Sequence, residues 1–178
     1  MTSIAAVVDE PNATGRAGAG LTDAQLGTYF SLIEVVSLLR HAVEEQLRDA
    51  GGLSYVQFQL LATLGDAADG HLRMTDLADG VVYSRSGLTY QVGLLEKRGL
   101  AVRGASPEDE RTVTVSLTDA GREVLATVFP GHIEVVRRLL FTALSEAQTE
   151  QLGGLLAPVR EQMRAEPPRS AGERRGRR

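Results

Sequence analysis

Apolar residues recur at helical spacing through the first strongly patterned stretch of the chain. Seven of them fall on one stripe of a helix: Leu26, Phe30, Ile33, Val36, Leu39, Val43 and Leu47. Thr22 and Gln25 have the spacing of a capping box at the start of this stripe, and Gly51-Gly52 marks its end. The pattern therefore predicts a long amphipathic helix.

A second capping-box pair, Ser54 and Gln57, opens a shorter helix that stops near Gly65. The apolar residues of this helix are Phe58, Leu60, Leu61 and Leu64. Two helices are thus expected before residue 70.

The next two elements predict a helix-turn-helix. Residues 72–80 allow two helical turns, for which Thr75 is the expected N-cap. Ser84 is the expected N-cap of a longer helix over 85–98, which ends before Gly99. The buried face of this longer helix is expected to carry Leu88, Val92 and Leu95. A short helix, a tight turn and a longer helix form the outline of a helix-turn-helix.

Two β-prone stretches follow, over 100–105 and 112–117, around a polar turn at 106–111. In the stretch 112–117 polar and apolar residues alternate strictly, which is typical of a half-buried strand. The two stretches predict a two-stranded β ribbon, which is the wing of a winged helix-turn-helix.

The remainder of the chain is helical in pattern. Thr118-Asp119 is suited to capping a long helix that Pro130-Gly131 should kink or break. Ser145 and Gln148 form a third capping-box pair, before a last helix with Leu152, Leu155, Leu156 and Val159. The predicted fold class is mainly α, with the winged helix-turn-helix between N- and C-terminal helices.

The two ends of the chain lack this patterning. Residues 1–20 are expected to be a disordered leader and residues 165–178 a basic flexible tail. From Arg164 onward six arginines face two glutamates, so the rest of the chain carries a formal charge of −8. The tail is interpreted as a solvated charged end or, alternatively, as a nonspecific contact for phosphates. DNA binding must therefore depend on local placement of charge.

Composition narrows the classes of function. The chain has no cysteine and three histidines, and it contains no glycine-rich phosphate loop, no His-Glu-x-x-His and no Gly-x-Ser-x-Gly. We therefore expect no metal, no cofactor and no enzymatic activity. No signal peptide and no uninterrupted apolar run of membrane-spanning length is seen, so we expect a cytoplasmic protein without a membrane partner.

Five blocks of sequence resemble the MarR family of winged helix-turn-helix regulators. They are Leu72–Ala78, Tyr83–Thr89, Leu95–Leu100, Pro107–Arg111 and Ser116–Gly121, in the family's order and close to its spacing. The resemblance implies that residues 51–118 form the DNA-binding domain, while 21–50 and 119–164 form a helical dimerisation region. It also implies a homodimer that binds double-stranded DNA, with the second helix of each winged unit in a major groove.

The resemblance also assigns residues to the DNA interface. The expected contacts are Thr75, Ser84, Arg85, Ser86, Thr89, Tyr90, Gln91, Arg98, Arg103, Asp109 and Arg111. Asp109 and Arg111 match an Asp-x-Arg wing motif, whose arginine is expected to enter the minor groove. Hydroxyl groups and helix N-termini suit phosphates, and Arg and Gln suit base edges, so the chemistry of this set agrees.

Each of these assignments has a plainer alternative. Ser84 could serve only as a helix cap, Arg85 and Arg103 as solvated charges, and Asp109 with Arg111 as a surface ion pair. Tyr90 either stacks on DNA or packs against a neighbouring helix. At the position of Tyr90 relatives commonly carry Arg, which leaves the operator sequence open.

A small effector is the remaining expectation. The resemblance implies an anionic or aromatic ligand between the dimerisation helices and the winged unit, and the candidate residues are Arg40, His41, Tyr55, Phe58 and His71. The expected function is a repressor that binds a pseudo-palindromic operator and is released by such a ligand. The alternative is a winged-helix scaffold for protein contacts without DNA binding.

Overall fold

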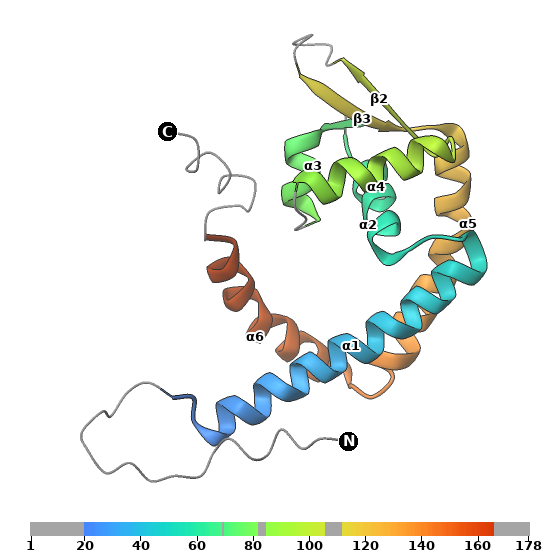
Figure 1. The fold of residues 1–178 in the computed structure, drawn as a ribbon. Helices are drawn as coiled ribbons and strands as arrows, with labels where there is room; N and C mark the ends of the chain where they lie inside the picture. The colour runs from blue at the N-terminus through green and yellow to red at the C-terminus, as the bar shows by residue number, and fades with distance from the viewer. Residues whose placement is uncertain (1–19, 69, 82–84, 106–111, 166–178) are drawn as a thin grey trace, which may run out of the picture. The chain divides into compact units, whose positions relative to one another are not determined.

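The computed structural model describes residues 20–68, 70–81, 85–105 and 112–165. Its helices are α1 (Asp23–Gly51), α2 (Tyr55–Gly65), α3 (Met74–Gly80), α4 (Arg85–Lys97), α5 (Asp119–Val136), a π-helical turn (Arg137–Phe141) and α6 (Glu146–Ala165). Its strands are β1 (His71–Arg73), β2 (Ala101–Ala105) and β3 (Val113–Leu117) (Figure 1). The predicted mainly α fold is confirmed.

Three of the predicted helix starts are confirmed by their caps. Ser54 and Gln57 form both hydrogen bonds of a capping box, and Ser145 and Gln148 do the same at α6. The Thr118 hydroxyl accepts a hydrogen bond from the Gly121 N–H at 3.0 Å. These caps satisfy N–H groups that have no partner within their helix, which explains why the sequence signals were sufficient.

The sheet differs from the expected two-stranded wing. It is three-stranded and antiparallel in the order β1-β3-β2, and Leu72 of β1 lies opposite Val115 of β3. Because residues 71–73 form a strand, α3 begins only at Met74 and Arg73 is its N-cap residue. The prediction that Thr75 caps this helix is therefore wrong, and the Thr75 hydroxyl instead donates to Asp76 Oδ1 at 3.2 Å.

The expected effect of Pro130 is also corrected in part. Helix α5 runs through Pro130 without a break, and the irregular turn comes later, over Arg137–Phe141. There the Thr142 N–H and hydroxyl both donate to the Arg137 carbonyl. The missing proline N–H is thus tolerated inside the helix.

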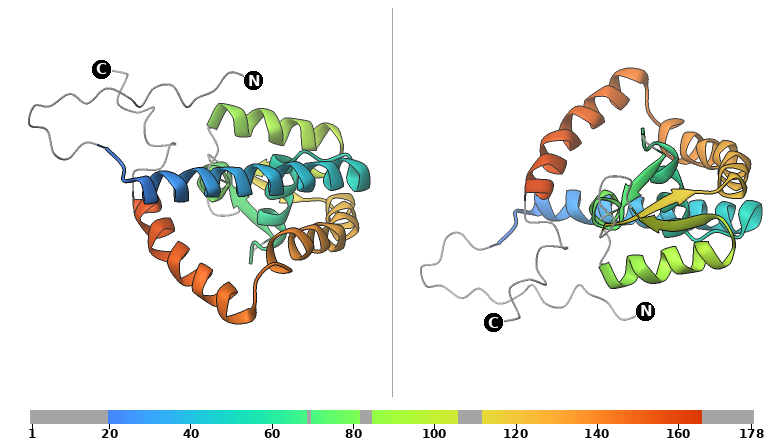
Figure 2. Two further views of the ribbon diagram at one scale, coloured as in Figure 1. Left: turned by 90° about the horizontal axis from the view of Figure 1, so that it is seen from below. Right: turned by 90° about the horizontal axis from the view of Figure 1, so that it is seen from above.

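One apolar core holds α4 in place beside the sheet. Figure 2 shows this helix, in yellow-green, and the strands. Leu88, Val92 and Leu95 of α4 are fully buried, as predicted. They share this core with Leu60 and Leu61 of α2, and with residues of α1, α3, α5 and the sheet. The buried side of α4 is therefore fixed, and its opposite side remains exposed.

Helix α1 belongs to two compact units, since the chain divides between Val36 and Ser37. In the second unit Val43 and Leu47 are buried in the core. In the first unit most apolar side chains of α1 remain exposed, with Phe30 at 59% and Val36 at 53%. The predicted apolar stripe is thus covered only in its last third.

By length and composition α1 would also suffice to cross a membrane. Its most apolar 18-residue window has a mean hydropathy of 1.2, and 6% of that window is buried. The helix contains no uninterrupted apolar run of that length, because polar residues such as Ser31 and Glu34 interrupt the stretch. Exposed apolar helix surfaces of this kind often mark sites of interaction.

Candidate nucleic-acid interface

The exposed side of α4 carries polar and aromatic side chains. Ser86, Thr89 and Tyr90 are exposed, and Tyr90 retains 65% of its accessible surface. Tyr90 is therefore not buried against a neighbouring helix among the residues that the structure describes. Hydroxyl groups on an exposed helix face can donate to phosphate oxygens, and an exposed ring can stack or contact a base edge.

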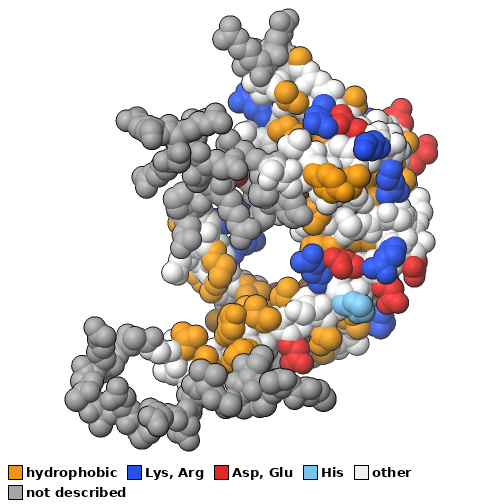
Figure 3. Space-filling model, viewed as in Figure 1, with side chains coloured by type: hydrophobic (Ala, Val, Ile, Leu, Met, Phe, Trp, Pro, Cys, Tyr) orange, Lys and Arg blue, Asp and Glu red, His pale blue; other side chains and the backbone are white. Residues whose placement is uncertain are grey.

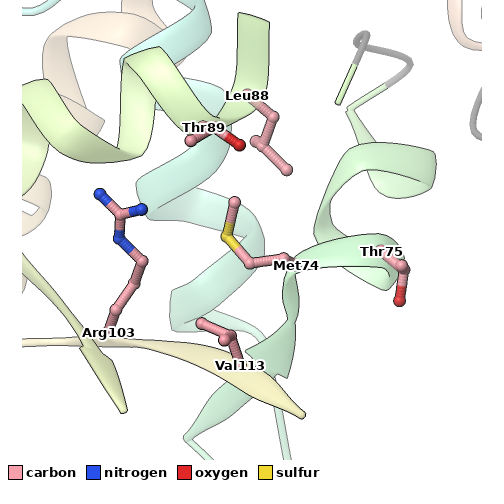
Figure 4. Close-up of a pocket in the computed structure, with 6 residues that line it drawn as sticks. All are labelled: Met74, Thr75, Leu88, Thr89, Arg103 and Val113. Carbon is pink, nitrogen blue, oxygen red and sulfur yellow. The ribbon is translucent and has the colours of Figure 1, made fainter. Parts of the chain in front are cut away.

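A pocket of about 310 Å³ lies between this helix, α3 and the sheet. Figure 4 shows the residues that line it, which are Met74, Thr75, Leu88, Thr89, Arg103 and Val113. The structure thus brings three of the predicted interface residues together: Thr75, Thr89 and Arg103.

Arg103 of β2 is joined to Glu96 of α4. Its Nε donates to Glu96 Oε2 at 2.8 Å, and its backbone N–H donates to Glu96 Oε1 at 3.0 Å. The hydrogen bond from Arg103 holds the pKa of the Glu96 carboxyl below its ordinary value, and the same bond raises the pKa of the Arg103 guanidinium. Arg103 is thus an ion-paired side chain that joins the sheet to α4. The negative charge of Glu96 compensates its positive charge.

Arg98 does not lie free at the end of α4. Its Nη1 donates to the Gly52 carbonyl and its Nη2 to the Gly51 carbonyl, both at 2.8 Å. These bonds satisfy carbonyl groups at the end of α1, which have no partners within the helix. Arg98 therefore has a structural role at the end of α1, and its contact with DNA stays a prediction.

Gln91 is half-buried and contacts α2. Its Oε1 accepts a hydrogen bond from Gln57 Nε2 at 3.4 Å, and Gln57 itself is 8% exposed. Gln91 thus lies at the border between the buried and exposed sides of α4.

Several predicted contacts lie outside the described residues. They are Ser84, Asp109 and Arg111, together with the side chain of Arg85, whose backbone begins α4. Their roles stay predictions.

Of the predicted effector residues, the structure brings Arg40 and Tyr55 into contact, and the ligand-binding role of the set stays a prediction. Arg40 lies over the Tyr55 ring, with its Cζ 5.5 Å from the ring centroid, and it pairs with Glu44. Phe58 is buried and its ring lies 4.5 Å from the ring of His132. His41 is exposed on α1, and His71 is paired with Ser116 in the sheet.

The larger of the two described pockets, about 450 Å³, lies between α2, the end of β3 and α5. Its lining residues are Ala62, Gly65, Asp66, Leu117, Arg122, Leu125, Ala126, Phe129 and Pro130. None of the five predicted effector residues lines it. No cluster of three metal-ligating side chains occurs within the part of the chain that the structure describes.

Sequence reasoning missed four polar residues that shape this region: Gln46, Gln57, Glu96 and His132. The capping-box pattern identified Gln57 as a helix residue, but its bond to α4 is a tertiary contact. Gln46 donates from α1 to the Val128 carbonyl of α5 at 3.2 Å. Spacing along the chain carries no signal for such contacts.

The helix pair α3–α4 beside the antiparallel sheet defines a winged helix-turn-helix protein. A family model described as the MarR family matches residues 51–112. The chain is 30% identical over 108 residues to the HTH-type transcriptional regulator MhqR of Bacillus subtilis, covering 61% of this chain and 72% of that protein. It is 27% identical over 122 residues to the transcriptional repressor YetL of Bacillus subtilis, covering 68% of this chain and 72% of YetL.

Solved structures of MarR family regulators resemble this chain in fold and in sequence. The MarR family regulator Sco3205 from Streptomyces coelicolor, solved in complex with DNA, has a TM-score of 0.78 and 33% identity, covering 88% of this chain and 96% of that chain. The MarR family regulator AbsC from the same organism has a TM-score of 0.78 and 30% identity, covering 84% of this chain and 100% of that chain. The chain belongs to the MarR family of transcriptional regulators. Membership of this family confirms the prediction of a transcriptional regulator rather than an enzyme.

Proposed function

We propose that this protein binds double-stranded DNA as a homodimer at a pseudo-palindromic operator and represses transcription there in the cytoplasm. The observation that carries the proposal is the exposed face of α4, with Ser86, Thr89 and Tyr90, on a helix whose other face is locked into the core. A rigid helix with one polar face suits insertion into a major groove.

The homodimer is supported by apolar side chains that this chain leaves uncovered (Figure 3). On α6, Leu155 is 63% and Met163 71% exposed. On the first unit of α1, Phe30 and Val36 are more than half exposed. A second copy is the partner that would cover both helices, because a two-fold interface uses the same surface on each subunit.

A two-fold dimer determines the form of the operator. Its two α4 helices would enter successive major grooves about 34 to 36 Å apart, and the DNA half-sites would share the symmetry of the protein. A ligand that prefers a dimer with another spacing would weaken DNA binding by its difference in affinity for the two forms. Arg40 and Tyr55, which contact each other, are the members of the predicted effector set that one anionic or aromatic ligand could meet together.

The proposal is tested by selecting genomic fragments with the purified full-length protein and titrating the best fragment against salt. Light scattering of the free protein and of the complex gives the number of chains. We expect a palindromic site, two chains per site and an affinity that falls steeply with salt. If no fragment is enriched at low salt, or if one chain binds an asymmetric site, the proposal is wrong.

A further inference from the structure

Ser54, Gln57 and Gln91 form a chain of hydrogen bonds from the start of α2 to α4. The Ser54 N–H donates to Gln57 Oε1 at 3.1 Å, and Gln57 Nε2 donates to Gln91 Oε1 at 3.4 Å. The Gln57 N–H in turn donates to Ser54 Oγ at 3.3 Å. The middle residue is 8% exposed, whereas Ser54 is exposed and Gln91 is half-buried, so the hydrogen bonds run from the surface through a buried side chain to α4.

The Ser54 N–H, which is the first donor, determines the direction of these hydrogen bonds. A backbone N–H can only donate, so the atom of Gln57 that faces Ser54 must be its oxygen. The atom that faces Gln91 is then the Gln57 amide nitrogen, which in turn requires an oxygen from Gln91. Reversing either amide would place two donors or two acceptors together at a largely buried position, which is unfavourable.

The consequence falls on Gln91, next to the exposed Tyr90 on α4. With its oxygen committed to Gln57, the other amide atom of Gln91 is Nε2, which can only donate. The bidentate pairing of glutamine with adenine requires both amide atoms to face the base, and the oxygen of Gln91 is directed toward Gln57, so this pairing is disfavoured for this residue.

We propose that Gln91 contacts DNA only as a hydrogen-bond donor, and that Gln57 is the positioning residue that sets this polarity. The inference rests on the proposed function, in which α4 enters the major groove. The DNA partner is an acceptor: purine N7, guanine O6, thymine O4 or a phosphate oxygen. Adenine N6 and cytosine N4 are donors, with which the Gln91 amide nitrogen cannot pair.

The sharpest test is Gln57→Glu, which keeps an oxygen for Ser54 but replaces the Nε2 donor by a second oxygen. At pH 8, where a carboxyl group is ionised, Gln91 must turn its Nε2 toward residue 57 and its Oε1 toward the DNA. Selection of bound fragments should then shift one symmetric pair of operator positions from acceptor bases to donor bases. The expected change in preference is on the order of tenfold.

Gln91→Met and the double variant Gln57→Glu/Gln91→Met are the matched controls. If Gln57 acts through Gln91, the double variant selects the same sequences as Gln91→Met alone. An equal effect of Gln57→Glu with and without Gln91 would mean a purely structural role and would overturn the inference. If Gln57→Glu fails to fold by thermal unfolding, Gln91→Glu replaces it, because a carboxylate at position 91 accepts from Gln57 and presents its second oxygen outward.

The two sources of the acceptor give different results. A base edge gives a changed sequence preference, whereas a phosphate oxygen gives a loss of affinity for Gln57→Glu that is equal on all sequences. If the wild-type protein selects a palindrome and Gln91→Met binds it with unchanged affinity and preference, only this inference fails. If the wild-type protein selects no DNA, the proposed function fails with it.

Discussion

Glu96 and Arg103 join α4 to strand β2 through three donors on one carboxylate: the Arg103 backbone N–H, Nε and Nη2. Each side chain is about one-third exposed or less, so the pair is better shielded than an ordinary surface ion pair. The contact joins α4, the helix that is proposed to enter the major groove, to strand β2 of the wing. It is therefore expected to matter for DNA binding as well as for stability.

Replacing Glu96 by Gln removes the negative charge that binds Arg103. In the wild-type protein the hydrogen bond from Arg103 lowers the pKa of this carboxyl group. We expect unfolding to require about 1 kcal/mol less at pH 7. The lowered pKa stabilises the fold above the ordinary carboxyl range, and this stability is lost as the pH falls through the folded pKa. Urea unfolding at pH 7 and at pH 3 measures both effects.

The control is Glu134→Gln, which breaks the exposed pair of Glu134 with Arg137. That change should have little effect. Equal stability losses for the two variants would contradict the special role of the Glu96–Arg103 pair.

Arg98 should contribute to stability and not to DNA binding. Arg98→Met leaves the Gly51 and Gly52 carbonyls without its two bonds, and we expect a loss of about 1 to 2 kcal/mol in the free energy of unfolding. Lys97→Met removes the same charge from an exposed neighbour and should leave stability within about 0.5 kcal/mol. A larger loss of operator affinity for Arg98→Met than for Lys97→Met would show instead that Arg98 contacts DNA.

Gly121 permits the close approach of α5 to the end of α4. A Cβ at this position would lie 2.0 Å from the Leu100 carbonyl oxygen, so Gly121→Ala requires backbone movement. We expect a loss of about 2 to 3 kcal/mol by urea unfolding. Gly153→Ala on α6, where a Cβ meets nothing within 4 Å, should instead be neutral or stabilising. Equal effects of the two changes would show that the α5 contact is looser than described.

The partly buried position of His132 predicts that the stability of the fold depends on pH. Burial lowers its pKa, and its Nδ1 has no hydrogen-bond partner among the described residues. The unfolded chain, with a histidine pKa of about 6.5, thus binds this proton more readily, so stability falls as the pH drops below about 6.5. The fall ends at the lower pKa of the folded state.

His132→Phe keeps a ring against Phe58 and removes the orphaned nitrogen. It should raise the free energy of unfolding by about 1 kcal/mol near neutral pH and flatten its decline below about pH 6.5. Exposed His41, changed to Gln, is the control and should leave the decline in place. Parallel curves for wild type and His132→Phe would exclude His132 as the source.

The sequence was most informative where structure is local. Capping pairs such as Ser54 with Gln57, and the spacing of Leu88, Val92 and Leu95, predicted helix starts and the buried side of α4 because these signals act within one or two turns. Strand β1 was missed because three residues give no periodicity, and the error at Thr75 followed from it. The true partners of Arg98, Arg103 and Gln91 lie on other elements, and spacing along the chain does not predict such contacts.

Binding of the operator by the exposed face of α4 is the central claim. The most direct measurement compares the operator affinity of Thr89→Ala/Tyr90→Ala with that of wild type, at fixed salt and with equal dimer content. Thr127→Ala on the exposed side of α5 is the control. We predict at least about a tenfold loss for the α4 variant, with wild-type affinity for the control. Unchanged affinity of the α4 variant would contradict the claim.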